Sequence, residues 1–280
     1  MTSIYARIPQ IDWDQGFRRH WNGGNPAVTH AFNALSFMFP QAENYFIEIV
    51  REVAHDLDIK NHELGRAIKG FIAQEATHSH QHNQYNAVLE KQGFENVVHD
   101  FINRLQEQSR RSFSSLTKLA IVCGYEHYTA ILGNYILRNP QVLNSAEPDL
   151  ALVWGWHSAE ETEHKAVCFD LYREAGGGWF RRELAFLLVT FNFSLMFGRL
   201  YLNLLYRDGC LKPSRLAKTL QQSLSFFFGV SGIAWHLIGY GVRYLSPWFH
   251  PWDNNNRFEL EFWISSNHKR LRSSSESRER

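Results

Sequence analysis

The chain has 280 residues, of which 29 are Lys or Arg and 28 are Asp or Glu, so its formal net charge at pH 7 is only +1. This balance creates no basic surface that a nucleic acid would select, and we expect no nucleic-acid partner. Hydrophobic residues make up 44% of the sequence, which excludes a disordered chain and supplies material for a large core. The 3 cysteines form no Cys-x-x-Cys pair, so we expect neither a disulfide framework nor a thiolate zinc site.

The first 25 residues mix charged residues with proline and lack the uninterrupted apolar core that a secretory signal requires. We therefore expect residues 1–25 to form an N-terminal arm. The low cysteine content favours a reducing compartment, so we expect a cytoplasmic protein, with membrane association left open.

Helical periodicity dominates residues 26–175. In the stretch 43–57 apolar residues recur at steps of three and four, and the stretches 116–137 and 151–172 repeat this pattern. Short alternating runs bounded by Asn-Gly or Asp-Gly turns, which indicate β-hairpins, are missing. We predict an all-α fold in which residues 26–175 form the main domain.

Two strongly apolar stretches follow the main domain. Residues 185–206 contain one charged residue, Arg199, and residues 220–242 contain none, so each approaches the ~20 residues needed to cross a bilayer. Polar residues at steps of seven and four nevertheless give the first stretch a stripe that lipid would penalise. We expect residues 180–250 to form an apolar helical hairpin that packs on the main domain, with peripheral membrane contact left open. The polar segment 265–280 is expected to be a disordered tail.

Two Glu-x-x-His pairs lie inside predicted helices: Glu75 with His78, and Glu161 with His164. A step of three residues returns a side chain to nearly the same face of a helix, so each pair directs a carboxylate and an imidazole the same way. A single pair of this kind is common on a solvated helix face. Two pairs in one chain become informative when further carboxylates lie at matched positions.

Two further glutamates precede the pairs at similar intervals. Glu43 lies 32 residues before Glu75 and Glu126 lies 35 residues before Glu161, while 51 residues separate Glu75 from Glu126. The shorter intervals suit a helix, a turn and an antiparallel return, and the longer one leaves room for a crossover. This order is typical of a ferritin-like four-helix bundle, in which one Glu from each of two helices and a Glu-x-x-His from each of the other two hold two metal ions.

Two more histidines lie about one helical turn from these pairs. His157 precedes Glu161 by four residues, and His82 follows His78 by four. Either could be an extra ligand or a group that supports a ligand. Carboxylate and imidazole donors suit iron, manganese or zinc, and buried carboxylates are costly unless they are coordinated or paired. We expect two metal ions, iron ahead of manganese or zinc.

Four segments carry a resemblance to a known family. They are FPQAENYFI at 39–47, FIAQEATHSHQHNQYN at 71–86, GYEHYTA at 124–130 and WGWHSAEETEHKAVCFDLY at 154–172. Over nearly its whole length the chain resembles a bacterial family described as predicted metal-dependent hydrolases, a description that carries no established reaction. The ligand pattern is also similar to that of di-iron para-aminobenzoate N-oxygenases, which have an additional His four residues before the second Glu-x-x-His. This resemblance implies the ligands Glu43, Glu75, His78, Glu126, His157, Glu161 and His164, and it contains no counterpart of His82.

The leading functional hypothesis is a non-haem di-iron oxidoreductase, an oxygenase that activates O₂ and oxidises an apolar or aromatic small molecule beneath the apolar hairpin. No flavin or nicotinamide motif is visible, so a separate reductase would supply electrons. The alternative is metal-dependent hydrolysis by a metal-bridged hydroxide, which asks for a general acid or oxyanion donor that the sequence does not identify. A non-catalytic metal store or scaffold is a third class. No catalytic residue beyond the ligands is assigned, and a homodimer is left open.

Overall fold

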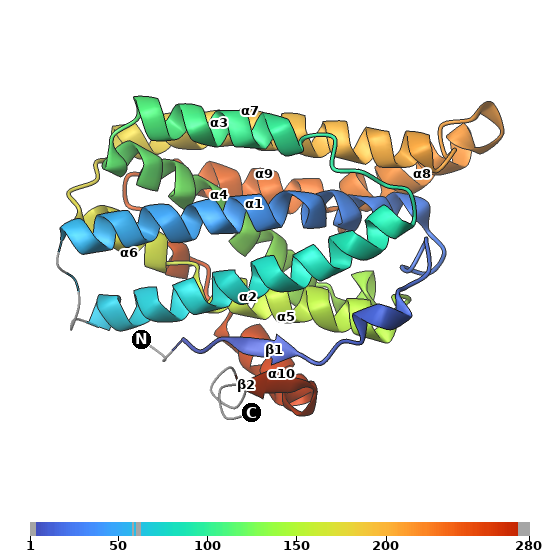
Figure 1. Cartoon of the computed structure of the whole chain (residues 1–280), viewed down its shortest axis with the longest axis horizontal. Coiled ribbons are helices and arrows are strands. Elements are labelled where there is room, and N and C mark those ends of the chain that lie inside the picture. The colour runs from blue at the N-terminus through green and yellow to red at the C-terminus, as the bar shows by residue number, and fades with distance from the viewer. Residues whose placement is uncertain (1–3, 58, 60–62, 274–280) are drawn as a thin grey trace.

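The computed structural model describes residues 4–57, 59 and 63–273. Within this part of the chain nearly all regular structure is helical (Figure 1). The exceptions are two three-residue strands, β1 (Arg7–Pro9) and β2 (Leu271–Ser273), which pair antiparallel. The predicted all-α class is confirmed. Short 3-10 turns lie at Trp13–Gln15, Pro140–Val142, Pro251–Asp253 and His268–Arg270.

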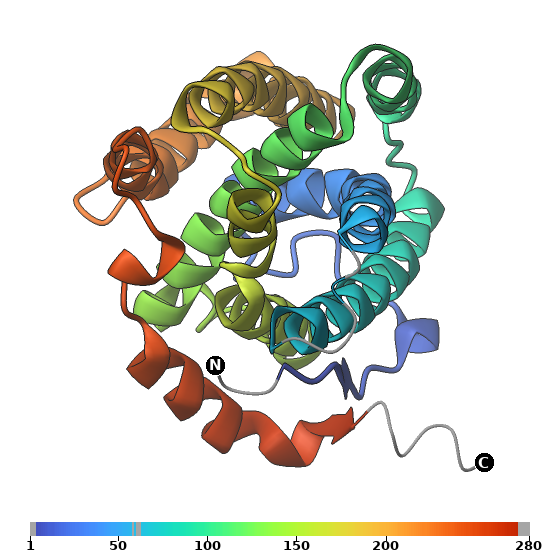
Figure 2. The same ribbon diagram turned by 90° about the vertical axis from the view of Figure 1, so that its left-hand side faces the viewer.

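Four helices carry all of the predicted metal ligands. They are α1 (Pro26–Asp56), α2 (Glu63–Lys91), α4 (Ser115–Arg138) and α5 (Pro148–His164). α1 packs along α2 and α4 packs along α5, while α1 also contacts α4 and α2 also contacts α5. Figures 1 and 2 show these helices side by side around a common interior. The ferritin-like classification of this arrangement stays a prediction.

Local sequence explains where these helices begin and end. Asn25 caps α1, because its side chain accepts hydrogen bonds from two backbone N–H groups of the first turn, and Pro26 fits the first helical position. Pro148 begins α5 in the same way. α5 ends at His164, and after a two-residue turn the chain continues as α6 (Val167–Glu174).

α3 (His99–Ser112) lies in the crossover between α2 and α4 for which the sequence left room. It packs on α1, where the hydroxyl oxygens of Tyr45 and Ser109 are 2.8 Å apart. Its solvent side is charged, and Arg110 there pairs with Glu48 of α1 at 2.7 Å. α3 therefore covers one side of α1 without entering the interior that the four ligand-bearing helices share.

The apolar stretches form three helices rather than a two-helix hairpin. They are α7 (Trp179–Arg207), α8 (Pro213–Phe228) and α9 (Ile233–Tyr244). The second stretch is divided because Gly229 ends α8 and Gly232 precedes α9, both with extended backbone. α7 packs on α1 and α4, α8 packs on α1, and α9 packs on α4 and α8. One side of each of the three helices remains exposed.

The expected disordered tail, residues 265–280, is ordered in the part that the structure describes. α10 (Arg257–Asn267) leads through a 3-10 turn into β2. β2 forms because β1 offers an edge for backbone pairing, and Arg270 also pairs with Asp149 at 2.6 Å. The expectation is therefore wrong up to β2, and residues 274–280 lie outside the described residues.

Asp208, which follows α7, ties the N-terminal arm to the apolar helices. Its carboxylate accepts hydrogen bonds from Arg19, from His20 Nε2 at 2.5 Å and from His30 Nε2 at 3.2 Å. Burial alone would raise the pKa of Asp208, but these donors hold it far below its usual range. Because the folded-state pKa lies below the unfolded value of ~3.9, the carboxylate stabilises the fold above about pH 4 and this contribution is lost as the pH falls.

We expect Asp208→Asn to lower the free energy of unfolding at pH 7 by about 2 kcal/mol, because Arg19, His20 and His30 lose their charged acceptor. Urea denaturation of both proteins measures this difference. The difference in the free energy of unfolding between wild type and variant should become smaller as the pH is lowered below about 4. If this difference is the same at neutral and acidic pH, the charge of Asp208 does not stabilise its contacts with Arg19, His20 and His30.

Candidate metal centre

Four glutamates, one from each ligand-bearing helix, point into the same interior. They are Glu43 of α1, Glu75 of α2, Glu126 of α4 and Glu161 of α5, and each is at most 2% exposed. Each lies among buried apolar residues of its helix, so the packing of the helices carries the carboxylate inward. Buried carboxylates are costly unless a cation or hydrogen-bond donors compensate them.

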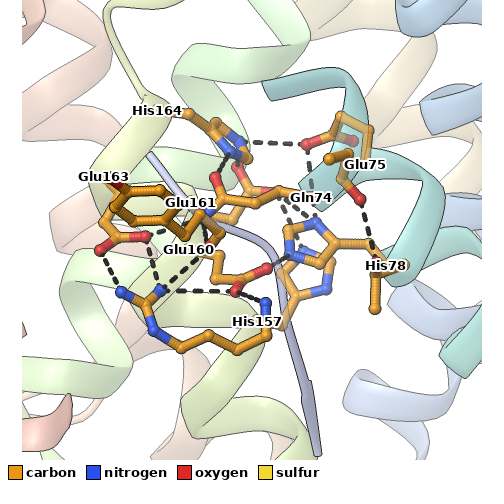
Figure 3. Close-up of polar contacts among 12 residues, drawn as sticks. Gln74, Glu75, His78, His157, Glu160, Glu161, Glu163 and His164 are labelled. Carbon is orange, nitrogen blue, oxygen red and sulfur yellow. Dashed lines mark hydrogen bonds and ion pairs between the residues drawn. The ribbon is translucent and has the colours of Figure 1, made fainter. Parts of the chain in front are cut away.

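Three histidines, His78, His157 and His164, complete the cluster, and each is at most 4% exposed. Ligand atoms lie within 4.8 Å of one another in three groups: Glu43–His78–His157, Glu75–His78–Glu161 and Glu75–Glu126–His164. The groups share members and form one seven-residue cluster, part of which is drawn in Figure 3. The structure therefore brings together all seven residues that the sequence singled out. Their role as metal ligands stays a prediction.

His164 turns Nε2 toward the carboxylates and is held through its other ring nitrogen. The side-chain amide nitrogen of Gln74 donates to Tyr5 O at 3.1 Å and to Glu163 at 2.7 Å, so its oxygen accepts from His164 Nδ1 at 2.9 Å. Nε2 lies 3.1 Å from Glu75 Oε1 and within 3.5 Å of two further cluster carboxylates. A neutral His164 thus directs a lone pair at carboxylate oxygens, an arrangement that a shared cation stabilises.

His157 is oriented by a chain of buried hydrogen bonds. The amide nitrogen of Asn86 donates to Ser36 O at 3.0 Å, so Asn86 Oδ1 accepts from the Ser36 hydroxyl at 2.7 Å. The Ser36 oxygen then accepts from His82 Nδ1 at 2.9 Å, which leaves His82 Nε2 to accept from His157 Nδ1 at 2.9 Å. His157 Nε2 therefore carries the lone pair, and it lies 3.1 Å from Glu161.

His82 contacts His157 and belongs to none of the converging ligand groups among the described residues. Its position fits the alternative in which it supports a ligand, because it fixes the tautomer of His157. A metal-binding histidine depends on the partner of its second ring nitrogen for orientation and basicity. The spacing of four residues from His78 correctly placed His82 on the side of α2 that faces the cluster. It could not show that His82 would contact the imidazole ring of His157.

We expect His82→Phe to weaken metal binding by about 10- to 100-fold, because His157 loses its acceptor while the ring volume is kept. Competition with a chromophoric chelator measures the affinity. His80→Phe is the matched control, since His80 lies on the exposed side of the same helix. Equal metal affinity in the two variants would mean that the chain from Asn86 to His157 does not govern the site.

His78 is held by a network that reaches the N-terminal strand (Figure 3). His78 Nε2 lies 3.1 Å from Glu160 Oε2, and the other oxygen of Glu160 accepts from the backbone N–H of Arg7 at 2.8 Å. The Arg7 guanidinium binds Glu163 through two hydrogen bonds of 2.7 and 2.8 Å. Sequence reasoning missed Arg7, because the contact to Glu160 spans 153 residues and leaves no periodic signal.

The cluster contains buried polar atoms that lack hydrogen-bond partners among the described residues. They include both carboxylate oxygens of Glu43, Glu75 and Glu126, together with His78 Nδ1, His157 Nε2 and His164 Nε2. An unsatisfied buried polar group costs ~1–3 kcal/mol, and native proteins contain few of them. Their concentration at one point fits a bound cation. Carboxylate oxygens and imidazole nitrogens form a donor set that suits iron, manganese or zinc.

Burial and neighbouring charges shift the pKa values of the cluster in both directions: His164 and other histidines lower those of Glu75 and Glu161. Burial raises the pKa of Glu43 and of Glu126 well above the usual range, and neighbouring carboxylates add to the effect. Burial alone would lower the pKa of His78, but Glu160 and Glu75 outweigh it and raise this pKa to about 10. The same carboxylates would also favour a bound cation.

An apolar cavity of about 180 Å³ adjoins the cluster at Glu43 and Glu161. Its apolar walls come from α1, α3, α4 and α7 and include Met38, Phe46, Ile121, Leu188, Phe193 and Met196. No Lys, Arg or His is among the described residues that line it. The cavity therefore suits an uncharged apolar group whose reacting atoms meet the two carboxylates.

A family model described as a predicted metal-dependent hydrolase matches residues 5–255. The match includes all seven residues of the cluster and the apolar helices α7 to α9, and it ends before α10. No curated protein and no solved structure matches the chain. The similarity to para-aminobenzoate N-oxygenases stays a prediction.

Proposed function

Because the chain belongs to the family of predicted metal-dependent hydrolases, we propose that the seven-residue cluster holds two metal ions and that the protein hydrolyses an ester bond of an apolar substrate. The proposal is carried by one observation: a cluster of buried carboxylates and imidazoles, many of them without hydrogen-bond partners among the described residues, adjoins an apolar cavity at Glu43 and Glu161. Bound metal ions would lower the pKa of a water molecule and polarise a carbonyl oxygen.

The lining of the cavity supports an ester rather than a phosphate ester as the substrate. A phosphoryl group carries negative charge and is usually bound by Arg or Lys, and the described lining contains neither. The two acidic residues of the lining, Glu43 and Glu161, would repel an anion that is not neutralised. An uncharged carbonyl group attached to an apolar chain needs no Arg or Lys partner and is not repelled by Glu43 and Glu161.

Tyr125 is a candidate for the hydrogen-bond donor that hydrolysis requires. It lines the same cavity as Glu43 and Glu161. Burial raises its pKa above the usual range, so the phenol keeps its proton and can donate. A donor directed at a carbonyl oxygen stabilises the charge that develops there during attack. The spacing of the Glu and His residues held no information about this residue, which faces the cavity from α4.

We expect Tyr125→Phe to lower kcat for an apolar ester by ~10²- to 10³-fold, because it removes the donor to the carbonyl oxygen. The metal content should be unchanged. Tyr128→Phe is the matched control, since the Tyr128 hydroxyl donates to Thr190 at 2.9 Å and Tyr128 is not part of the cavity lining. A Tyr125 variant with wild-type kcat would remove Tyr125 from the reaction.

Oxidation by O₂, which sequence reasoning ranked first, is the second candidate. Four carboxylates and three imidazoles beside an apolar cavity are the observation that favours it. In this case iron would supply the redox chemistry, and a separate reductase would deliver the electrons. The seven-residue cluster would again hold the metal ions, and the apolar walls of the cavity would exclude water and position the substrate. The family description favours hydrolysis, which we therefore place first.

Two experiments on one preparation distinguish the candidates. Metal analysis of the purified protein gives the number and kind of bound ions. Turnover of a medium-chain p-nitrophenyl ester is then measured under argon and in air. Equal turnover in both atmospheres supports hydrolysis. No ester turnover, together with O₂ uptake and an optical change when the reduced iron form meets O₂, would replace hydrolysis by oxidation.

A further inference from the structure

Large apolar side chains are concentrated on the outer side of α7, α8 and α9. Of the 24 exposed large hydrophobic residues in the described chain, 19 lie between Trp179 and Trp248. On each helix they recur at steps of three and four, so each helix presents one apolar stripe. The stripes include Leu184, Leu187, Phe191 and Leu195 on α7, Leu220, Leu224 and Phe228 on α8, and Trp235, Ile238 and Val242 on α9.

The three helices form one layer, so their stripes belong to one surface. Phe227 of α8 packs edge-on against Phe197 and Tyr201 of α7. Arg182 of α7 donates to the carbonyl oxygen of Tyr244 at the end of α9 at 2.9 Å. Figure 2 shows this layer on the side of the molecule away from α2. A soluble monomer rarely exposes so many large apolar side chains on one layer of helices, which indicates a binding face. We call it the apolar face.

The charges around the apolar face are almost all positive. Residues 179–248 contain eight Lys or Arg and two acidic residues, Glu183 and Asp208, which are bound by Arg182 and by Arg19. Exposed cations without an ion pair among the described residues are Arg199, Lys212, Arg215, Lys218 and Arg243. Three exposed tryptophans, Trp179, Trp235 and Trp248, lie on the same segment. Exposed apolar stripes with Trp and flanking Lys and Arg are typical of helices that lie in the surface of an anionic bilayer.

The packing of α7 favours a position on the membrane surface rather than across it. The segments Trp179–Arg207 and Pro213–Tyr244 are long and apolar enough to cross a bilayer. In α7, however, 39% of the most apolar window is buried against the rest of the protein, and the opposite side alone is exposed. A helix that shares one side with a polar domain cannot be surrounded by lipid, whereas it can press its free side into the interface.

The cavity beside the metal cluster reaches the margin of the apolar face. Leu188 of α7 lines the cavity and is itself 41% exposed. A second hollow shares Phe113, Ile121 and Leu188 with the cavity and extends to Phe180 and Leu184 on the face. The two hollows therefore mark a path along α7 by which an apolar chain lying in the membrane would approach Glu43 and Glu161.

We propose that the apolar face docks on an anionic lipid bilayer and that the cavity receives its substrate, a lipid-like ester, from that bilayer. The docking follows from the apolar stripes and the charges alone. The identity of the substrate rests on the proposed function. Docking lays α7, α8 and α9 into the interface and brings the mouth of the cavity at Leu188 against the acyl chains.

Vesicle flotation of the full-length protein tests the docking. The vesicles contain phosphatidylcholine alone or with an equal amount of phosphatidylglycerol. We expect the wild type to bind both and to bind the anionic vesicles about tenfold or more tightly, with a preference that falls at high salt. The double variant Leu224→Glu, Phe228→Glu should bind at least about tenfold more weakly, because both side chains leave the interface. Leu57→Glu is the matched control, since Leu57 is exposed at the end of α1.

Two outcomes would overturn the docking. The first is a wild type that floats with neither vesicle. The second is a wild-type dimer that the double variant converts into a monomer, since the apolar face would then belong to a second copy of the chain. Far-UV circular dichroism and metal content confirm that the variants are folded, which is expected because both side chains are more than half exposed.

The same variants test whether the cavity receives a lipid-like ester from the bilayer. We expect the double variant to hydrolyse a water-soluble short-chain ester like the wild type, and to lose at least about tenfold in turnover of an ester embedded in anionic vesicles. Equal loss on both esters would overturn delivery from the membrane. If no form of the protein hydrolyses any ester while the wild type still binds vesicles, the proposed function fails and the docking stands.

Discussion

Glu161→Gln will lose metal and activity together, with at most one metal ion retained per chain and turnover lowered by at least ~10³-fold. The reason lies in the position of Glu161 at the centre of the cluster. One of its oxygens lies 3.1 Å from His157 and 3.6 Å from His78, and the other lies 3.3 Å from His164. Glutamine keeps the shape of the side chain but removes the negative charge that would bind the metal ions.

Metal analysis and ester turnover of the same preparation measure this result. Glu48→Gln is the matched control on α1, because Glu48 pairs with Arg110 on the surface. Far-UV circular dichroism checks that the Glu161 variant is folded, because His157 and His164 lose their contact with a charged carboxylate. Full metal occupancy in this variant would exclude Glu161 as a ligand and would leave the proposed chemistry without its central residue.

Removal of the metal ions should lower the melting temperature by about 10–20 °C. Two ions present at ~100 times their dissociation constants contribute ~2.7 kcal/mol each, and ~1 kcal/mol shifts the melting temperature of a protein of this size by ~2–4 °C. The carboxylates of the cluster, among them Glu43 and Glu126, whose oxygens have no hydrogen-bond partner in the described part of the chain, would then face one another without a bound metal ion.

Calorimetry before and after dialysis against a chelator tests this effect. Addition of Fe(II), Mn(II) or Zn(II) should restore the original melting temperature, whereas Ca²⁺ should not, because it prefers six to eight oxygen ligands and the cluster includes three imidazoles. A melting temperature that is the same with and without chelator would mean that the cluster binds no metal in the native protein.

The convergence of these glutamates and histidines could be predicted, because the periodicity of a helix determines which face each spacing places a side chain on. Glu75 with His78, and Glu161 with His164, lie three residues apart, and a helix must place each pair on one face. The all-α class followed from the same periodicity. The two further glutamates, Glu43 and Glu126, could be added because their intervals match a helix and its return.

The groups that orient His157 and His164 could not be predicted, because their contacts join distant parts of the chain. Ser36 meets His82 across 46 residues and Gln74 meets His164 across 90. No local rule links such positions. The ordered segment beyond residue 265 was missed for the same reason, since a polar strand is stable here only because β1 offers its backbone.

The pairing of β1 with β2 also links the two ends of the described chain to the metal centre. Arg7 of β1 binds both Glu160 and Glu163, and Glu160 in turn positions His78. A fusion or truncation at the C-terminus that pulls β2 away would remove the strand that pairs with Arg7, and we expect it to disturb metal uptake by residues in the middle of the sequence. A purification tag placed there could therefore yield protein poor in metal although every ligand is intact.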